Sequence, residues 1–80
     1  MAMLLIVTST GAQDPTRASI PFHIAVNGAA ASGQDCGVAL AGDATDLLKS
    51  SVSRGVTGVG IPPLAALLAG CAEKGVRFYV

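Results

Sequence analysis

The chain has 80 residues, enough for one small domain, and its five basic and five acidic residues leave no net charge. Without a basic patch or many aromatic residues, nucleic acid is not an expected partner. No apolar run is long enough to span a membrane, and no signal peptide is recognisable, so a cytoplasmic protein is expected. Hydrophobic residues make up 51% of the chain, more than so small a core needs, which predicts an oligomer or a missing covering part.

The N-terminal part predicts a strand, a polar loop and a helix in close succession. Residues 4–7 are a short apolar run that ends in two β-branched residues, which is typical of a buried strand. Hydroxylated residues and Gly11 follow as a loop. Asp14 and Pro15 then mark a helix start, because aspartate can accept from free N–H groups and proline suits the first helical position.

The first helix is expected over residues 15–32. Pro21 removes a backbone donor inside it, so a kink or a false start is expected there. Gly33 suits the left-handed position that ends a helix. The residues that lie near one face at helical spacing are Ile20, Ile24, Ala31 and either Asn27 or Gly28.

The middle of the chain predicts a second strand followed by a short helix. The strand is expected over residues 36–41 and to be buried on both faces. Asp43 can cap a helix over residues 44–49. Residues 50–61 carry three glycines and are expected to form a loop.

The C-terminal part predicts a third helix and a last strand. The helix is expected over residues 64–74, with Gly75 ending it, and the strand over residues 76–80. The helix has a clear stripe for burial, formed by Leu64, Leu67, Leu68 and Cys71.

The order β-α-β-α-α-β predicts one α/β domain over residues 1–80 with a parallel sheet and right-handed crossovers. The expected strand order is 2-1-3, which puts the first and third helices on opposite faces of the sheet. A switch point would then lie between the first and third strands, beside the loop after Thr8. Residues 78–80 would form an exposed apolar edge, which indicates a longer domain or pairing with another chain.

The loop after the first strand is the main candidate site. Its hydroxyls, free amides and following helix N-terminus suit an oxyanion or a phosphate. It is similar to the phosphate loop of flavodoxins, but Gln13 stands in place of the last threonine and Asp14 would repel a phosphate. A capped polar loop without a ligand is the plainer interpretation. The candidate ligand-binding residues are Thr8, Ser9, Thr10, Gly11, Asp14 and Arg17.

Other residues carry weaker signals. Asp14 and Arg17 could pair with each other, or hold a substrate or a neighbouring subunit. His23 has no carboxylate at a spacing that would orient it, so a surface or satisfied histidine is favoured over a general base. Cys36 and Cys71 are expected to be free structural thiols, because neither lies at an electropositive helix start. No metal site, catalytic residue or cofactor is predicted.

Several segments together resemble the DsrE/DsrF-like family of small sulfur-handling proteins. The resemblance spans nearly the whole chain in the right order, and its most specific parts are the Asp-Pro-Thr-Arg-Ala-Ser segment and the Gly-Asp-Ala turn. The matching segments are residues 4–8, 14–19, 21–30, 41–44, 58–64 and 75–80.

The resemblance implies a flavodoxin-like three-layer αβα fold, homo-oligomers such as trimers or hexamers, and sulfur transfer through a cysteine. In the family this cysteine usually follows the third strand, so it would lie beyond Val80 and is absent here; the chain is expected to lack a C-terminal part. A sulfur-relay protein would then be a partner. Two alternatives are a module that binds a small ligand, phosphate or nucleotide through the loop from Thr8 to Gly11, and a non-catalytic structural subunit of an oligomer.

Overall fold

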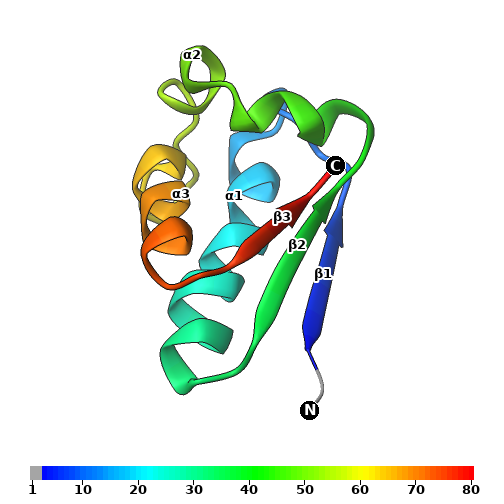
Figure 1. Cartoon of the computed structure of the whole chain (residues 1–80). Helices are drawn as coiled ribbons and strands as arrows, with labels where there is room; N and C mark the ends of the chain where they lie inside the picture. Colours follow the sequence, from blue (N-terminus) through cyan, green and yellow to red (C-terminus); the bar gives the residue numbers. More distant parts are fainter. Residues whose placement is uncertain (1–2) are drawn as a thin grey trace.

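The computed structural model describes residues 3–80. It contains one parallel sheet, and helices connect its strands along the chain (Figure 1). The elements in chain order are β1 (Leu4–Thr8), α1 (Pro15–His23), η1 (Ile24–Ala29), η2 (Ala30–Ser32), β2 (Cys36–Leu40), η3 (Gly42–Leu48), α2 (Ser50–Ser53), α3 (Leu64–Glu73) and β3 (Arg77–Tyr79). The α/β character with three parallel strands is therefore confirmed, and the strands and the first and last helices lie in the expected chain order.

The start and end of the first helix follow the sequence signals. Asp14 is the N-cap, with its carboxylate accepting from the backbone N–H of Arg17 at 3.2 Å, and Pro15 opens the helix. Pro21 lies inside α1, and the helix changes to a π-helix, η1, directly after α1 ends. Gly33 ends the helical segment with a φ of 84°.

The buried stripe of this segment differs from its exposed apolar face. Ile20 and Ile24 lie on the exposed side and keep 40% and 47% of their surface accessible. The buried stripe consists of Ala18, Phe22, Ala25, Val26 and Ala29. Apart from Phe22, the side chains of this stripe are small. The segment can therefore pack closely on its neighbours.

Two predictions for the middle of the chain need correction. Asp43 was expected to cap an α-helix, but η3 is a 3₁₀-helix with Ala41 at its N-cap and no side-chain cap bond. Gly42 turns the chain with a φ of 56°, which leaves Asp43 in the first turn. The expected loop over residues 50–61 begins with the short helix α2.

The third helix is confirmed in position and in buried stripe. Leu64, Leu67 and Cys71 are buried, and Leu68 packs against the core from a partly buried position. Gly75 follows the helix with a φ of 76°, in the left-handed region where a glycine carries no steric cost.

The sheet order is β1-β2-β3, so the expected order 2-1-3 is wrong. All pairs are parallel, and β2 is the central strand. Two crossovers of the same hand that step in the same direction put their helices on one face of the sheet. Contact between α1 and α3 agrees with this arrangement, so the expectation that they lie on opposite faces is also wrong (Figure 1).

The last helix packs closely on the first helical segment. A Cβ at Gly70 of α3 would lie 2.9 Å from Cγ2 of Val26, so the glycine allows α3 to approach the first helical segment. The chain then enters β3 beside β2, where Phe78 pairs with Val38. The ring of Phe78 meets that of Phe22 edge to face, with centroids 5.6 Å apart.

The described chain therefore forms two layers, helices and sheet, with the core between them. Both β1 and β3 are edge strands. The prediction that β1 is buried is wrong, because Leu5 and Val7 are 48% and 70% exposed. The prediction that β2 is buried on both faces holds in part: four of its five residues are buried, but no helix covers its second face, where side chains of flanking strands cover Gly37 and Ala39 is half-buried.

Candidate functional site

The predicted ligand loop lies at the carboxyl end of an edge strand. Thr8 is buried there, and its carbonyl oxygen accepts from the N–H of Ala41 at 3.0 Å. Ser9 is exposed and Thr10 is half-buried. Because β2 separates β1 from β3, the expected switch point between the first and third strands does not exist among these strands.

Gly11 is the point where two loops meet. A Cβ at Gly11 would lie 2.7 Å from Oε1 of Gln13 and 2.8 Å from both Cβ and the carbonyl oxygen of Asp43. Any side chain would force the loops apart. The Gln13 amide also donates to the Asp43 carboxylate at 3.5 Å. Gly11 is therefore needed for loop packing, whether or not a ligand binds.

Asp14 and Arg17 are brought together, as their spacing allows. In addition to the capping bond, Nε of Arg17 lies 3.6 Å from Oδ2 of Asp14, and both side chains are well exposed. An exposed pair of this kind contributes less than about 1 kcal/mol. The arrangement is that of a capped helix start with a surface ion pair. His23, further along α1, has its Nδ1 3.0 Å from Nδ2 of Asn27.

A shallow hollow of about 430 Å³ lies beside this loop, and the sequence did not indicate it. Its lining residues are Ala12, Gln13, Asp43, Asp46 and Val52. Asp46 pairs with Lys49 at 3.2 Å, whereas Asp43 has no cation within 4.0 Å among residues 3–80. The only available signal was that the turns after β1 and β2 both contain glycine, and this does not reveal their contact.

The charges at this edge disfavour an anion. Asp14 occupies the cap of α1, and Asp43 and Asp46 line the adjacent hollow. Carboxylates there repel a phosphate and compete for the free N–H groups of the helix start. Across the described part of the chain, no three metal-ligating side chains come together either.

Both cysteines are buried in the core and unsuited to nucleophilic chemistry. Burial, and second the nearby charge of Asp35, raise the pKa of the Cys36 thiol. Burial, and second the electrostatic repulsion from Cys36, raise the pKa of Cys71 to about 11. Both thiols are therefore protonated at neutral pH, and a protonated thiol is a poor nucleophile. A second hollow, of about 280 Å³, touches Cys36 at the amino edge of the sheet.

One face of the sheet has no helix over it. In register, Ile6, Val38 and Phe78 point toward the helices and pack in or against the core. Because side chains alternate along a strand, the residues next to these point the other way. The open side, called the bare face below, consists of Met3, Leu5, Val7, Gly37, Ala39, Arg77 and Tyr79.

The bare face is apolar and closely packed at its centre. A Cβ at Gly37 would lie 2.9 Å from Cε2 of Tyr79 and 3.6 Å from Cε of Met3, so these side chains extend over the glycine from both flanking strands. Tyr79 nevertheless keeps 41% of its surface exposed. Parallel sheets are normally covered on both faces, so an uncovered apolar face is an unusual feature.

Comparison with known proteins gives no further assignment. Models of known protein families, curated proteins and solved structures show no match to this chain. Within residues 3–80, no helix is long and apolar enough to cross a membrane. The chain is thus described by its class, a small α/β protein with a parallel sheet and one bare face. Its resemblance to DsrE/DsrF-like proteins stays a prediction.

Proposed function

We propose that this chain is a non-catalytic subunit of a homo-oligomer and that a second copy covers its bare face. The observation that carries the proposal is the one-sided covering of an apolar parallel sheet. Both major helices lie on one side, where they bury the core. The opposite side leaves Leu5, Val7 and Tyr79 in contact with water.

The physical argument rests on the free energy of apolar surface. Removing apolar area from water stabilises by about 25 cal/mol per Å², and a contiguous apolar patch of several hundred Å² is typical of an interaction site. Three strands about 4.8 Å apart and five residues of about 3.3 Å each give a face near 15 Å by 17 Å. That is about 250 Å² on each copy, well below the roughly 800 Å² that each partner buries in a standard interface, so self-association through this face should be weak and should depend on concentration.

The loop from Thr8 to Gly11 supports a ligand function less well. A phosphate or nucleotide would meet the carboxylates of Asp14 and Asp43 close to the loop. No built anion site offsets that repulsion, and Gly11 has a packing reason for being glycine. Small-ligand binding through this loop stays a prediction.

Sulfur transfer also stays a prediction from the family resemblance. It requires a cysteine beyond Val80, because Cys36 and Cys71 are buried thiols with raised pKa values. A sulfur-relay partner is part of the same prediction. Persulfide labelling of the described chain should give no labelled product under native conditions.

The oligomeric state tests the proposal directly. Light scattering and sedimentation of the purified chain from micromolar to millimolar concentration should show a concentration-dependent dimer or higher oligomer. Leu5→Lys should shift the chain to monomer, because a lysine would have to be desolvated in the interface.

Ile24→Lys is a matched control. Ile24 is 47% exposed on the helical side and Leu5 is 48% exposed on the bare face, so both changes introduce the same charge at similar exposure. The control should associate like the parent chain. A parent chain that stays monomeric at millimolar concentration, or equal effects of the two substitutions, would contradict the proposal.

A further inference from the structure

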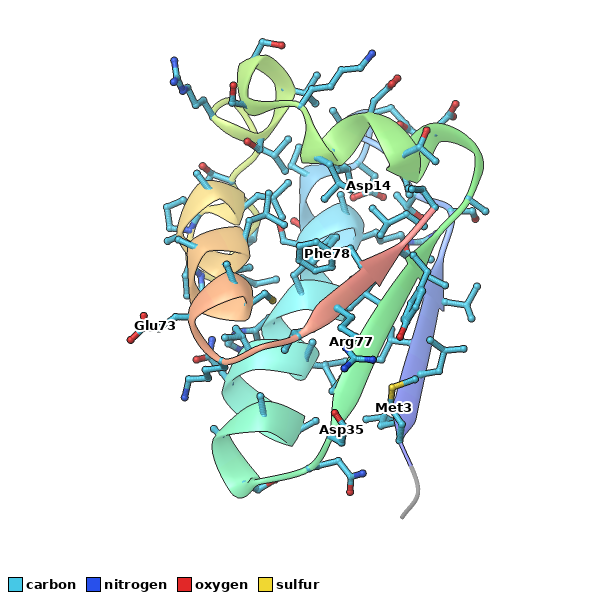
Figure 2. All side chains as sticks on the ribbon, in the orientation of Figure 1. Met3, Asp14, Asp35, Glu73, Arg77 and Phe78 are labelled. Carbon is cyan, nitrogen blue, oxygen red and sulfur yellow. The ribbon has the colours of Figure 1, made fainter. Side chains whose placement is uncertain are left out.

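Two side chains of opposite charge, Arg77 and Asp35, lie at the end of the sheet where its strands begin, which is called the amino edge below. Arg77 begins β3, is exposed, and is in register with Gly37 on the bare face. Asp35 directly precedes β2 and is also exposed. Figure 2 labels both side chains near this end of the sheet. Neither is within ion-pair distance of an opposite charge in the part of the chain that the structure describes.

Within the three strands that the structure describes, Arg77 is the only side chain charged at neutral pH that alternation places on the bare face, and Asp35, directly before β2, continues the alternation of Gly37 and Ala39. Covering this face would remove water from around the guanidinium. Burying a charge without a partner costs free energy. The covering surface must therefore supply a carboxylate, or the guanidinium must stay in water at the rim of the interface. This requirement restricts how a second copy can lie on the face.

A twofold axis between two facing sheets can run in any direction of the plane between them, and its two limiting directions are across the strands and along them. If the axis runs across the strands, the amino edge of one copy lies over the carboxyl end of the other, where the bare face presents Val7, Ala39 and Tyr79. That arrangement places Arg77 against apolar side chains. If the axis runs parallel to the strands, the amino ends of the two sheets meet, β3 lies over β1 of the other copy, and each Arg77 can extend toward the other copy's Asp35 at the start of the central strand.

We infer that the homo-oligomer is built on a twofold axis parallel to the strands, with Arg77 of each copy paired to Asp35 of the other. This inference rests on the proposed self-association and adds the contact that fixes its orientation. The same two residues form both pairs, as symmetry requires of an isologous interface. Because the apolar face is small, this pair should contribute noticeably to affinity and orientation.

The first test reverses each charge alone. Arg77→Glu and Asp35→Arg should each weaken dimerisation by about tenfold or more, because each homodimer then faces like charges. Arg54→Glu is the matched control. It makes the same substitution at an exposed arginine that follows α2, away from the strands, and should leave dimerisation unchanged.

The decisive test mixes the two single variants in equal amounts. In a heterodimer of Arg77→Glu with Asp35→Arg, both pairs between copies are complementary, while both pairs within a copy are repulsive. Sedimentation of the mixture should therefore recover the affinity of the parent dimer. An unrestored mixture would show that the two charges act within one copy and would overturn the inference.

The outcomes separate this inference from the proposed function. If Leu5→Lys yields monomers but neither charge reversal weakens the dimer, the bare face self-associates and the charge pairing is wrong. If the parent chain is monomeric at millimolar concentration, both the self-association and the inference fail.

Discussion

The two faces of the sheet differ in how they are completed. On the helical face, Phe22, Val38 and Phe78 are packed against one another by elements of the same chain. On the bare face, Tyr79 and Met3 cover only Gly37, while Leu5 and Val7 remain in water. One face thus supplies the stability of the fold within the chain, and the other retains apolar area for another molecule.

The largest expected effect separates the faces by their contribution to stability. Phe22→Ala should lower the free energy of unfolding by about 3–5 kcal/mol, because it empties a fully buried site and removes the contact with Phe78. Val7→Ala on the bare face should change it by no more than about 0.5 kcal/mol. Urea unfolding followed by circular dichroism, at micromolar protein concentration, measures both.

Phe22→Leu keeps this comparison measurable if the alanine variant does not fold. It should lose less than the alanine variant and more than Val7→Ala. Similar losses at positions 22 and 7 would mean that the bare face contributes to monomer stability as much as the helical face.

A second prediction uses the buried thiol of the helical face. The pKa of Cys71 is about 11 in the folded chain, compared with an ordinary value of 9.0. Above pH 9 the unfolded chain therefore binds fewer protons than the folded chain, and stability falls as pH rises toward 11. The loss from this group is about 2 kcal/mol.

Cys71→Ala isolates that contribution from other groups that titrate at high pH. Unfolding free energies of both chains between pH 8 and about 11 should converge as the pH rises. Parallel curves would mean that the thiol is not desolvated in the folded chain.

The smallest expected effect concerns the contact between the two helices. Gly70→Ala should cost about 1 kcal/mol, because its Cβ would lie 2.9 Å from Cγ2 of Val26. Gly28→Ala is the control, since no atom lies within 4 Å of the added carbon and the helical segment should gain about 0.5–1 kcal/mol. Thermal unfolding should move the two midpoints in opposite directions. A gain in both variants would mean that α3 can move away freely.

The sequence predicted the elements better than their arrangement. The cap at Asp14 and the left-handed turns at Gly33 and Gly75 depend on neighbouring residues, and all three were predicted. The order of strands depends on where β3 enters the sheet, and that depends on contacts between distant segments, of which Gly70 with Val26 is one example. No local pattern identifies two residues so far apart in the sequence as contacts.

The same division applies to the candidate site. The pairing of Asp14 with Arg17 follows from a spacing of three residues on a helix, so it could be anticipated. The contact of Gln13 with Asp43 requires β1 and β2 to be neighbours, and the bare face requires the strand order. Both became visible only once the arrangement of the strands was known.

The burial of both native thiols has a practical consequence. Cys36 and Cys71 are shielded and neutral, so they should react slowly with maleimides at neutral pH. A Val7→Cys variant would then offer one rapidly reacting thiol without removal of the native pair. Spin labels at that position, and at Ile24 in a second variant, would let pulsed resonance measurements report distances between copies from both sides of the sheet.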